Sequence, residues 1–296
     1  MKQFNDLLER NDLKVNKYTI KGRSMIVDTP LGQFALKKGN YNELYKYLLS
    51  RNFDYFPKMI DSSNNCSLYE YIDDVKYDDD QRALDLIHVV ALLHSKTAYY
   101  KDADLDEYKD LYEKIMNKIN YIYNYYLDTI NVIESTIYMS PSDYLIARNI
   151  SKIFSCIFYC KTELNKWYEM VKNKKRKRVV TLHNNLKLDN LVKSTKIYLL
   201  SWQKSCVDIP IYDFVNFYNM YALNFNFEAL LNEYERIFPF LEEEKVLFNV
   251  LISIPSKIQN CNREYEKVKN VRYVLDKIYK TESLLTPKEE EKGESA

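Results

Sequence analysis

Glycine is scarce in this sequence, with only 4 residues in 296, and there are only 3 His and 2 Trp. No glycine-rich phosphate-binding loop of the Walker type is present, and neither is a Ser-His-Asp or paired metal-ligand motif. No run of 18 apolar residues occurs, which excludes a transmembrane helix. The first ten residues are polar and acidic where a secretory signal would have an apolar core. With five scattered cysteines, these absences favour a cytoplasmic protein from a reducing compartment, without a membrane partner.

Charge of a single sign is also lacking, because 43 Lys and Arg face 42 Asp and Glu. A formal net charge of +1 gives no overall field toward nucleic acid or membrane. One local exception is the segment 172–178, where six of seven residues are basic. It can be a solvated connector or a contact for an anionic surface, and the balanced charge favours the connector. Cys156 and Cys160 lie four residues apart without a nearby His, which favours core thiols over a zinc site.

The first 75 residues show the pattern of short strands with one helix. β-prone runs at 15–20, 24–27 and 33–36 are separated by turn signals at 21–22 and 30–32. A helix is predicted over 41–50, followed by a strand over 66–72. This order of predicted elements indicates a small β-rich lobe.

From residue 80 the apolar residues follow the helical period. One stripe contains Leu84, Ile87, His88, Ala91 and Leu92, which predicts His88 in the core. Further helices are predicted over 105–122, 145–164 and 210–280, interrupted by strands at 179–182 and 197–200. The sequence therefore predicts a bilobal α+β fold with a β-rich lobe (1–75), a helical lobe (76–285) and a disordered tail (286–296).

The interruption between the helices contains the most informative segment, Val179 to Trp202. It begins VVTLHNNLKLDNLV and continues with IYLLSW after a short turn. It resembles the kinase-like fold of aminoglycoside and choline phosphotransferases and the CotS-type spore-coat proteins. These carry His-Gly-Asp, four residues, Asn, and then an aliphatic strand that ends in Ile-Asp. Other segments are similar in the same order: Phe34 to Lys37, Leu92 to His94, Asp208 to Phe214, the region around Tyr234, and Ile254 to Lys257.

On that pattern His183 and Asn190 match, whereas two carboxylates are replaced. Asn184 takes the glycine position, Asn185 that of the catalytic Asp, and Ser201 that of the metal-binding Asp. Phosphoryl transfer depends on positioning and on neutralising the transferred group, largely by Mg²⁺, which prefers anionic oxygen ligands. An Asn amide has no useful basicity and a Ser hydroxyl carries no charge. The resemblance therefore implies a degenerate site without a metal.

The remaining positions follow from the same resemblance. Lys37 would contact a phosphate or be a solvated strand residue, and Glu43 would pair with it or be an exposed helix residue. Tyr71 would belong to a hinge that binds adenine through backbone groups. With Asn190, these residues form the expected remnant of a nucleotide site. His183 and Asp213 are expected to hold the loop, and Asp189 is not expected to rescue the missing carboxylate.

These features predict a catalytically inactive, kinase-like binding or structural protein. Its expected partner is another protein, such as a spore-coat component, and nucleotide would bind without metal if it binds at all. One alternative is an active unconventional kinase that phosphorylates a small hydroxylated molecule or a protein. Another is an anion-binding protein that uses the basic segment.

Overall fold

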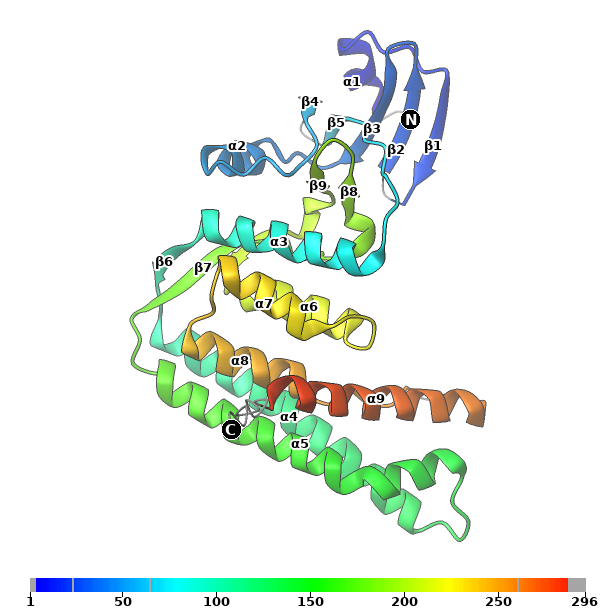
Figure 1. Ribbon diagram of the computed structural model, residues 1–296, viewed down its shortest axis with the longest axis vertical. Helices are drawn as coiled ribbons and strands as arrows, with labels where there is room; N and C mark the ends of the chain where they lie inside the picture. Colours follow the sequence, from blue (N-terminus) through cyan, green and yellow to red (C-terminus); the bar gives the residue numbers. More distant parts are fainter. Residues whose placement is uncertain (1–3, 23, 64, 260, 287–296) are drawn as a thin grey trace, which may run out of the picture. The chain divides into compact units, whose positions relative to one another are not determined.

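The computed structural model describes residues 4–22, 24–63, 65–259 and 261–286. It is α+β, with a β-rich N-terminal region and mainly helical segments after it (Figure 1), which confirms the predicted fold class. Two compact units are present: Met1–Tyr99 with Val179–Asp213 and Leu230–Pro239, and Tyr100–Arg178 with Phe214–Ala229 and Phe240–Ala296. The expected lobe boundary at residue 75 stays a prediction. All but the first residue of the expected tail, 286–296, lies outside the described residues.

A five-stranded antiparallel sheet lies in the first unit, in the order β1-β2-β3-β5-β4. The strands are β1 Lys17–Lys21, β2 Ser24–Thr29, β3 Gly32–Lys38, β4 Met59–Ser62 and β5 Cys66–Glu70. Gly22 and Gly32 have φ of 58° and 119° at the two predicted turns, a conformation that glycine adopts at little cost. The predicted strands of this region are confirmed.

Two helices accompany this sheet, α1 Asn5–Arg10 and α2 Asn42–Ser50, so the prediction of one helix before residue 75 was wrong. Helix α1 is short, with six residues, and is mostly polar. Its buried residues are Leu7 and Leu8. These pack with sheet residues such as Val27 and Leu36. Tertiary packing therefore stabilises a helix too short to show a sequence period.

Helix α3 Asp79–Thr97 begins at the cap Asp78, whose carboxylate accepts the N–H groups of Asp80 and Gln81. The prediction that His88 lies in the core was wrong. Its side chain is 40% exposed and pairs with Glu233 at 2.7 Å. Most faces of α3 are covered, and the fully buried histidine of this helix is His94. A helix buried nearly all round has no single apolar stripe from which its inner face can be read.

Short strands bring the loop region together. They are β6 Tyr99–Asp102, β7 Arg176–Leu182, β8 Leu191–Lys193, β9 Ile197–Leu199 and β10 Cys206–Asp208. Strand β7 lies between β10 and β6, and β8 pairs with β9 as a hairpin. Two single-turn 3₁₀ helices, η1 Leu188–Asn190 and η2 Trp202–Lys204, flank this hairpin.

The second unit is helical and centres on two long neighbours, α4 Leu105–Glu134 and α5 Pro141–Val171. A capping box of Ser140 and Asp143, with Pro141 in the first turn, starts α5. Cys160 is fully buried in α5, whereas the Cys156 thiol is half-buried and donates to the Ser253 carbonyl. Helices α8 Glu242–Ser253 and α9 Glu264–Leu285 also belong to this unit, whereas α6 Ile211–Tyr221 begins in the first unit and α7 Phe227–Ile237 lies mainly in it. Within the described ranges, no helix has the length and apolarity that spanning a bilayer requires.

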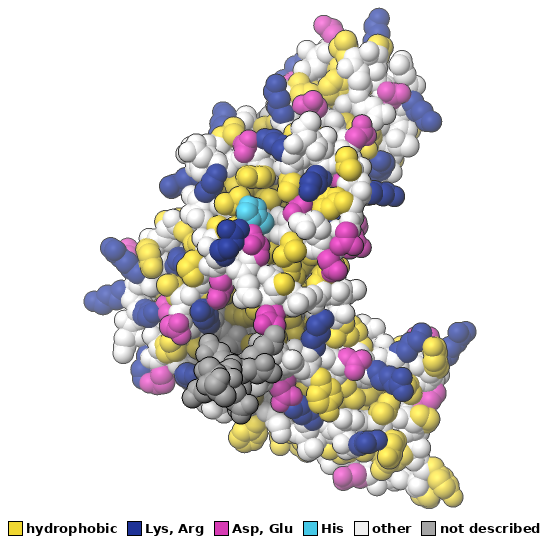
Figure 2. Space-filling model, viewed as in Figure 1, with side chains coloured by type: hydrophobic (Ala, Val, Ile, Leu, Met, Phe, Trp, Pro, Cys, Tyr) yellow, Lys and Arg dark blue, Asp and Glu magenta, His cyan; other side chains and the backbone are white. Residues whose placement is uncertain are grey.

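The basic segment is a set of ion pairs rather than a free loop. Its last three residues belong to β7, and five of its six cations have acidic partners in the same unit. The pairs are Lys172–Glu169, Lys174–Glu243, Arg176–Asp102, Lys177–Glu107 and Arg178–Glu244. Side chains of both signs are also interspersed over the face in Figure 2. A polyanion would have to compete with these carboxylates.

Lys277 gives the second unit a measurable pH dependence. It is buried on α9, donates to Asn219 Oδ1 at 2.7 Å, and is in no ion pair among the described residues. Burial, with a smaller effect of the Lys118 charge, lowers its pKa to about 8 from 10.5. Between these values the unfolded chain holds a proton that the folded protein lacks, so stability rises with pH by up to ~1.4 kcal/mol per pH unit.

We expect the stability of Lys277→Met relative to the natural protein to fall as pH rises from 8 to 10.5. Below pH 8 the penalty of the buried charge is fully present, so the difference between the two proteins should be flat there. Denaturant unfolding at several pH values measures it, with Lys269→Met, at an exposed position of the same helix, as the control. Parallel curves for Lys277→Met and the natural protein would contradict a buried charge.

Candidate functional site

The carboxylate of Asp213 organises the loop after β7. It is fully buried and accepts the backbone N–H of His183 at 2.8 Å and that of Asn184 at 2.6 Å. Asn184 has a φ of 55°, a left-handed conformation that favours glycine and, after it, Asn. The glycine position of the motif therefore retains its backbone shape in this chain. Asp213 supplies the hydrogen bonds that hold it.

A third bond to Asp213 comes from His94, which is also fully buried. His94 Nε2 lies 3.2 Å from Asp213 Oδ2, and its Nδ1 lies 2.6 Å from the Tyr234 hydroxyl. A carboxylate only accepts hydrogen bonds, so Nε2 carries a proton that it donates to Asp213, while Nδ1 shares a hydrogen bond with the Tyr234 hydroxyl. Tyr234, His94 and Asp213 thus form a buried chain that ends on the loop.

His183 spans the loop from the other side. Its Nε2 donates to the Leu200 carbonyl at 2.8 Å, and its ring meets that of Trp202 edge-on at 4.8 Å. Burial, with a smaller effect of the Lys37 charge, lowers the pKa of His183 to about 4 against the opposing effects of Asp213 and the Leu200 carbonyl. At neutral pH the ring is uncharged, with its proton on the nitrogen that faces Leu200. This geometry fits a residue that holds the loop rather than a base.

Asn185, Asn190 and Ser201 lie together, as the motif predicts, but are joined by neutral hydrogen bonds. Asn185 Nδ2 donates to the Ser201 carbonyl at 3.3 Å, and Asn190 Nδ2 donates to the Asn185 carbonyl at 2.7 Å. Ser201 has a φ of 69°, which is strained for a non-glycine residue. The side-chain amides of Asn185 and Asn190 hold the backbone in place here. Neither Asn185 nor Ser201 has an anionic side chain.

Acidic residues do not gather at this site. Among the described residues, no group of three or more His, Cys, Asp or Glu side chains is placed to hold a metal ion. Asp189 is exposed and lies in η1. The donor set at Asn190 and Ser201 is neutral, which fits Mg²⁺ poorly.

Lys37, on β3, is the cation that the resemblance predicts to contact a phosphate. Its ammonium lies over the Tyr69 ring, 5.9 Å from the centroid, and its charge acts on His183. Burial lowers its pKa, and among the described residues it makes no ion pair or hydrogen bond. Lys37 is half-buried, whereas its neighbour Lys38 is exposed. A half-buried cation without a counterion is suited to bind an anion.

The expected partners of Lys37 are arranged differently. Glu43 is exposed in the first turn of α2, and no ion pair joins it to Lys37 among the described residues, so that pairing is not formed. Tyr71 follows β5 as predicted, but its N–H donates to the Gln33 carbonyl at 3.3 Å and its hydroxyl accepts from Lys21. The Tyr71 N–H is therefore already engaged, which leaves fewer backbone groups for an adenine.

Sequence reasoning assigned no role to three residues that shape this site. His94 and Tyr234 lie in segments that carry the resemblance, and Trp202 ends its motif. Trp202 packs edge-on against Tyr45, Phe53 and Phe56. The pairing of His94 with Tyr234 joins positions 140 residues apart, and no local pattern could reveal it.

Two solved structures of similar fold are phosphotransferases. An aminoglycoside phosphotransferase from Alicyclobacillus acidocaldarius superposes with a TM-score of 0.67 at 8% identity, covering 91% of each chain. Spectinomycin phosphotransferase bound to AMP gives 0.52 at 11% identity, covering 97% of this chain and 95% of that one. No family model matches the sequence, and no curated protein does.

The chain therefore has the kinase-like fold of the aminoglycoside phosphotransferases. At identities this low the likeness concerns the fold alone. The chemistry of this chain depends on the side chains at its own site.

The neutral, buried state of His183 predicts a loss of stability in acid. Its pKa is about 4 in the folded protein, against 6.5 for a histidine side chain free in water, so the unfolded chain binds more protons between these pH values. Stability should fall through this window as the pH drops, by up to ~3 kcal/mol in total. His183→Gln keeps a donor for Leu200 and should lack this component.

Denaturant unfolding of both proteins from pH 7 to pH 4 measures the difference. The two stabilities should converge as the pH falls, because only the natural protein loses the contribution of a neutral histidine. A constant difference over this range would show that His183 is accessible to protons in the folded state.

Proposed function

We propose that this protein is a catalytically inactive kinase-like protein that binds a phosphate-bearing ligand without a divalent metal. One observation carries the proposal. Lys37 is half-buried, has no ion-pair partner among the described residues, and its charge acts on His183 in the loop, where the resemblance places Asn185 and Ser201 at positions that are Asp in the family. A nucleotide is the ligand class that the fold favours, since a spectinomycin phosphotransferase of similar fold was solved with ADP. Its role would be as a binding or structural component, with a spore-coat assembly as one setting.

Phosphoryl transfer would need two functions that these side chains do not supply. Asn185 cannot accept the proton of a substrate hydroxyl, and its amide already donates to the Ser201 carbonyl. Asn190 and Ser201 together offer no negative charge to a metal that bridges phosphates. Lys37 alone can neutralise part of a bound phosphate, which supports binding but not turnover.

The second candidate is an active kinase with unconventional chemistry, acting on a small hydroxylated molecule or a protein. The observation in its favour is that the structural neighbours are phosphotransferases over nearly their whole length. Such an enzyme would need a carboxylate from elsewhere in the chain. Asp189 is the nearest in sequence and is exposed.

A phosphotransfer assay on restored variants separates the two candidates. We expect no Mg²⁺-dependent ATP hydrolysis by the natural protein, by Asn185→Asp or by Ser201→Asp, because each lacks either the metal ligand or the base. Only the double variant should hydrolyse ATP, and slowly. Asp189→Asn is the matched control for rescue by the neighbouring carboxylate and should behave as the natural protein does.

Robust turnover by the natural protein that Lys37→Ala abolishes would establish the active kinase instead. Loss of that turnover in Asp189→Asn would also identify the replacement carboxylate. Circular dichroism and thermal unfolding of each variant should accompany the assay, because a carboxylate at position 185 would face the Ser201 carbonyl that now accepts a hydrogen bond.

A further inference from the structure

A cavity lies in the first unit, and Lys37 is not among the residues that line it. It has a volume of about 680 Å³ and is lined by α2, the segment 54–59, the segment 70–73 and the turn between β8 and β9. This volume is within the range of small-molecule sites. Strands β1, β2 and β3 contribute no lining residue, and Tyr71 is the only predicted site residue that does. A ligand here would therefore occupy a different place from one bound at Lys37.

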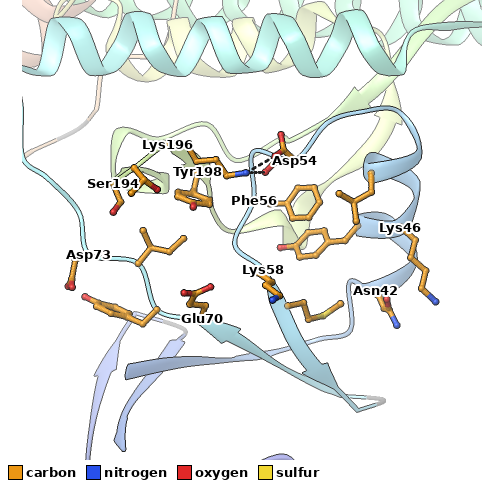
Figure 3. A pocket seen from close by; sticks show the side chains of 16 residues that line it. Asn42, Lys46, Asp54, Phe56, Lys58, Glu70, Asp73, Ser194, Lys196 and Tyr198 are labelled. Atoms are coloured by element: carbon orange, nitrogen blue, oxygen red, sulfur yellow. Dashed lines mark hydrogen bonds and ion pairs between the residues drawn. The ribbon is translucent and has the colours of Figure 1, made fainter. Parts of the chain in front are cut away.

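One wall of this cavity is aromatic and firmly packed. Phe56 stacks on Tyr45 with centroids 4.2 Å apart and planes 19° from parallel, and both side chains are buried. Tyr198 of β9 also lines the cavity, and Figure 3 shows it between Phe56 and Ser194. Such a wall offers a flat, rigid surface for an apolar or aromatic group.

Six charged side chains line the cavity, Lys46, Asp54, Lys58, Glu70, Asp73 and Lys196, and one pair of them forms an ion pair among the described residues. Lys196 binds Asp54 at 2.6 Å, as the dashed lines in Figure 3 show. Lys58 and Glu70 lie close together on the opposite side in the same view. Their backbones are hydrogen-bonded at 3.2 Å, but among the described residues neither side chain has an ion-pair partner. An exposed cation and an exposed anion thus line the cavity from neighbouring backbone segments.

We propose that this cavity binds a small zwitterion with an apolar body, such as a short peptide or an amino-acid-like molecule. The ligand's carboxylate would pair with Lys58, its ammonium with Glu70, and its apolar group would pack on Phe56 and Tyr45. A ligand with one charge would leave one of the two groups without a partner, so both charges contribute to recognition. This site is independent of the nucleotide site under the proposed function.

A built-in reporter lies behind the aromatic wall. Trp202 meets Tyr45 and Phe56 edge-on, with centroids 6.4 Å apart in each case. The chain has only one other tryptophan, Trp167, which is buried in α5 of the second unit. In a Trp167→Phe background, tryptophan fluorescence therefore reports on the packing behind this cavity.

The probe is the dipeptide glycyl-phenylalanine at pH 7, compared with its N-acetylated and C-amidated forms and with glycyl-alanine. Calorimetry measures affinity, and Trp202 fluorescence reports the place of binding. We expect the zwitterion to bind roughly threefold to fivefold more tightly than either singly charged form, the range for an exposed ion pair. Glycyl-alanine should bind more weakly still, because it lacks the ring.

Two variants test the assignment of each charge. Lys58→Met should abolish the preference for the free carboxylate over the amide, and Glu70→Gln should abolish the preference for the free ammonium over the acetyl form. Lys38→Met and Glu43→Gln, which change exposed charges of the same lobe outside the cavity, should leave both preferences intact.

Equal affinity for all four peptides, or no saturable binding, would overturn the proposal. So would competition with ADP, since that would place the peptide beside Lys37. Failure of ADP to bind would overturn the proposed function alone, because peptide binding at this cavity does not require a nucleotide.

Discussion

The hydrogen bonds accepted by Asp213 are the interaction on which the rest of the site depends. One buried carboxylate fixes the N–H groups of His183 and Asn184, and His94 and Tyr234 hold the carboxylate in turn. The left-handed turn at Asn184 would be strained without those bonds. Removing one partner of such a network usually costs about 3–5 kcal/mol, because the remaining buried group is left uncompensated. Buried hydrogen bonds thus keep the loop in one backbone shape.

The neutral side chains of Asn185 and Ser201 limit which ligands this loop can bind. In a phosphotransferase, negative side chains hold a metal, and the metal holds the phosphates. Here Asn185, Asn190 and the Ser201 backbone bond to one another, and Lys37 is a cation whose charge acts on His183. Among the described residues Lys37 has no carboxylate partner that an anionic ligand would have to displace. An anionic ligand would gain most from Lys37, and a divalent cation would gain little.

Much of the fold could be predicted from the sequence, because strands β2 and β3 and the long helices have clear periods and turns. The loop could be aligned to a family because its residue order survives from His183 to Ser201. Helix α1 and the inner face of α3 could not be predicted, since packing against distant residues decides both. The same limit applies to the site. The absent Lys37–Glu43 pair, the His94–Tyr234 bond and the cavity beside Phe56 each depend on contacts between segments that the sequence separates.

Calorimetric titration of ADP, with Mg²⁺ and with EDTA, tests the central claim most directly, because it measures what holds the phosphates. We predict that the affinity with and without Mg²⁺ agrees within about threefold, and that Lys37→Met lowers it at least tenfold, about 1.4 kcal/mol. Lys38→Met, at the exposed neighbouring position, should have little effect. An affinity that rises more than tenfold with Mg²⁺, and that survives Lys37→Met, would contradict the account.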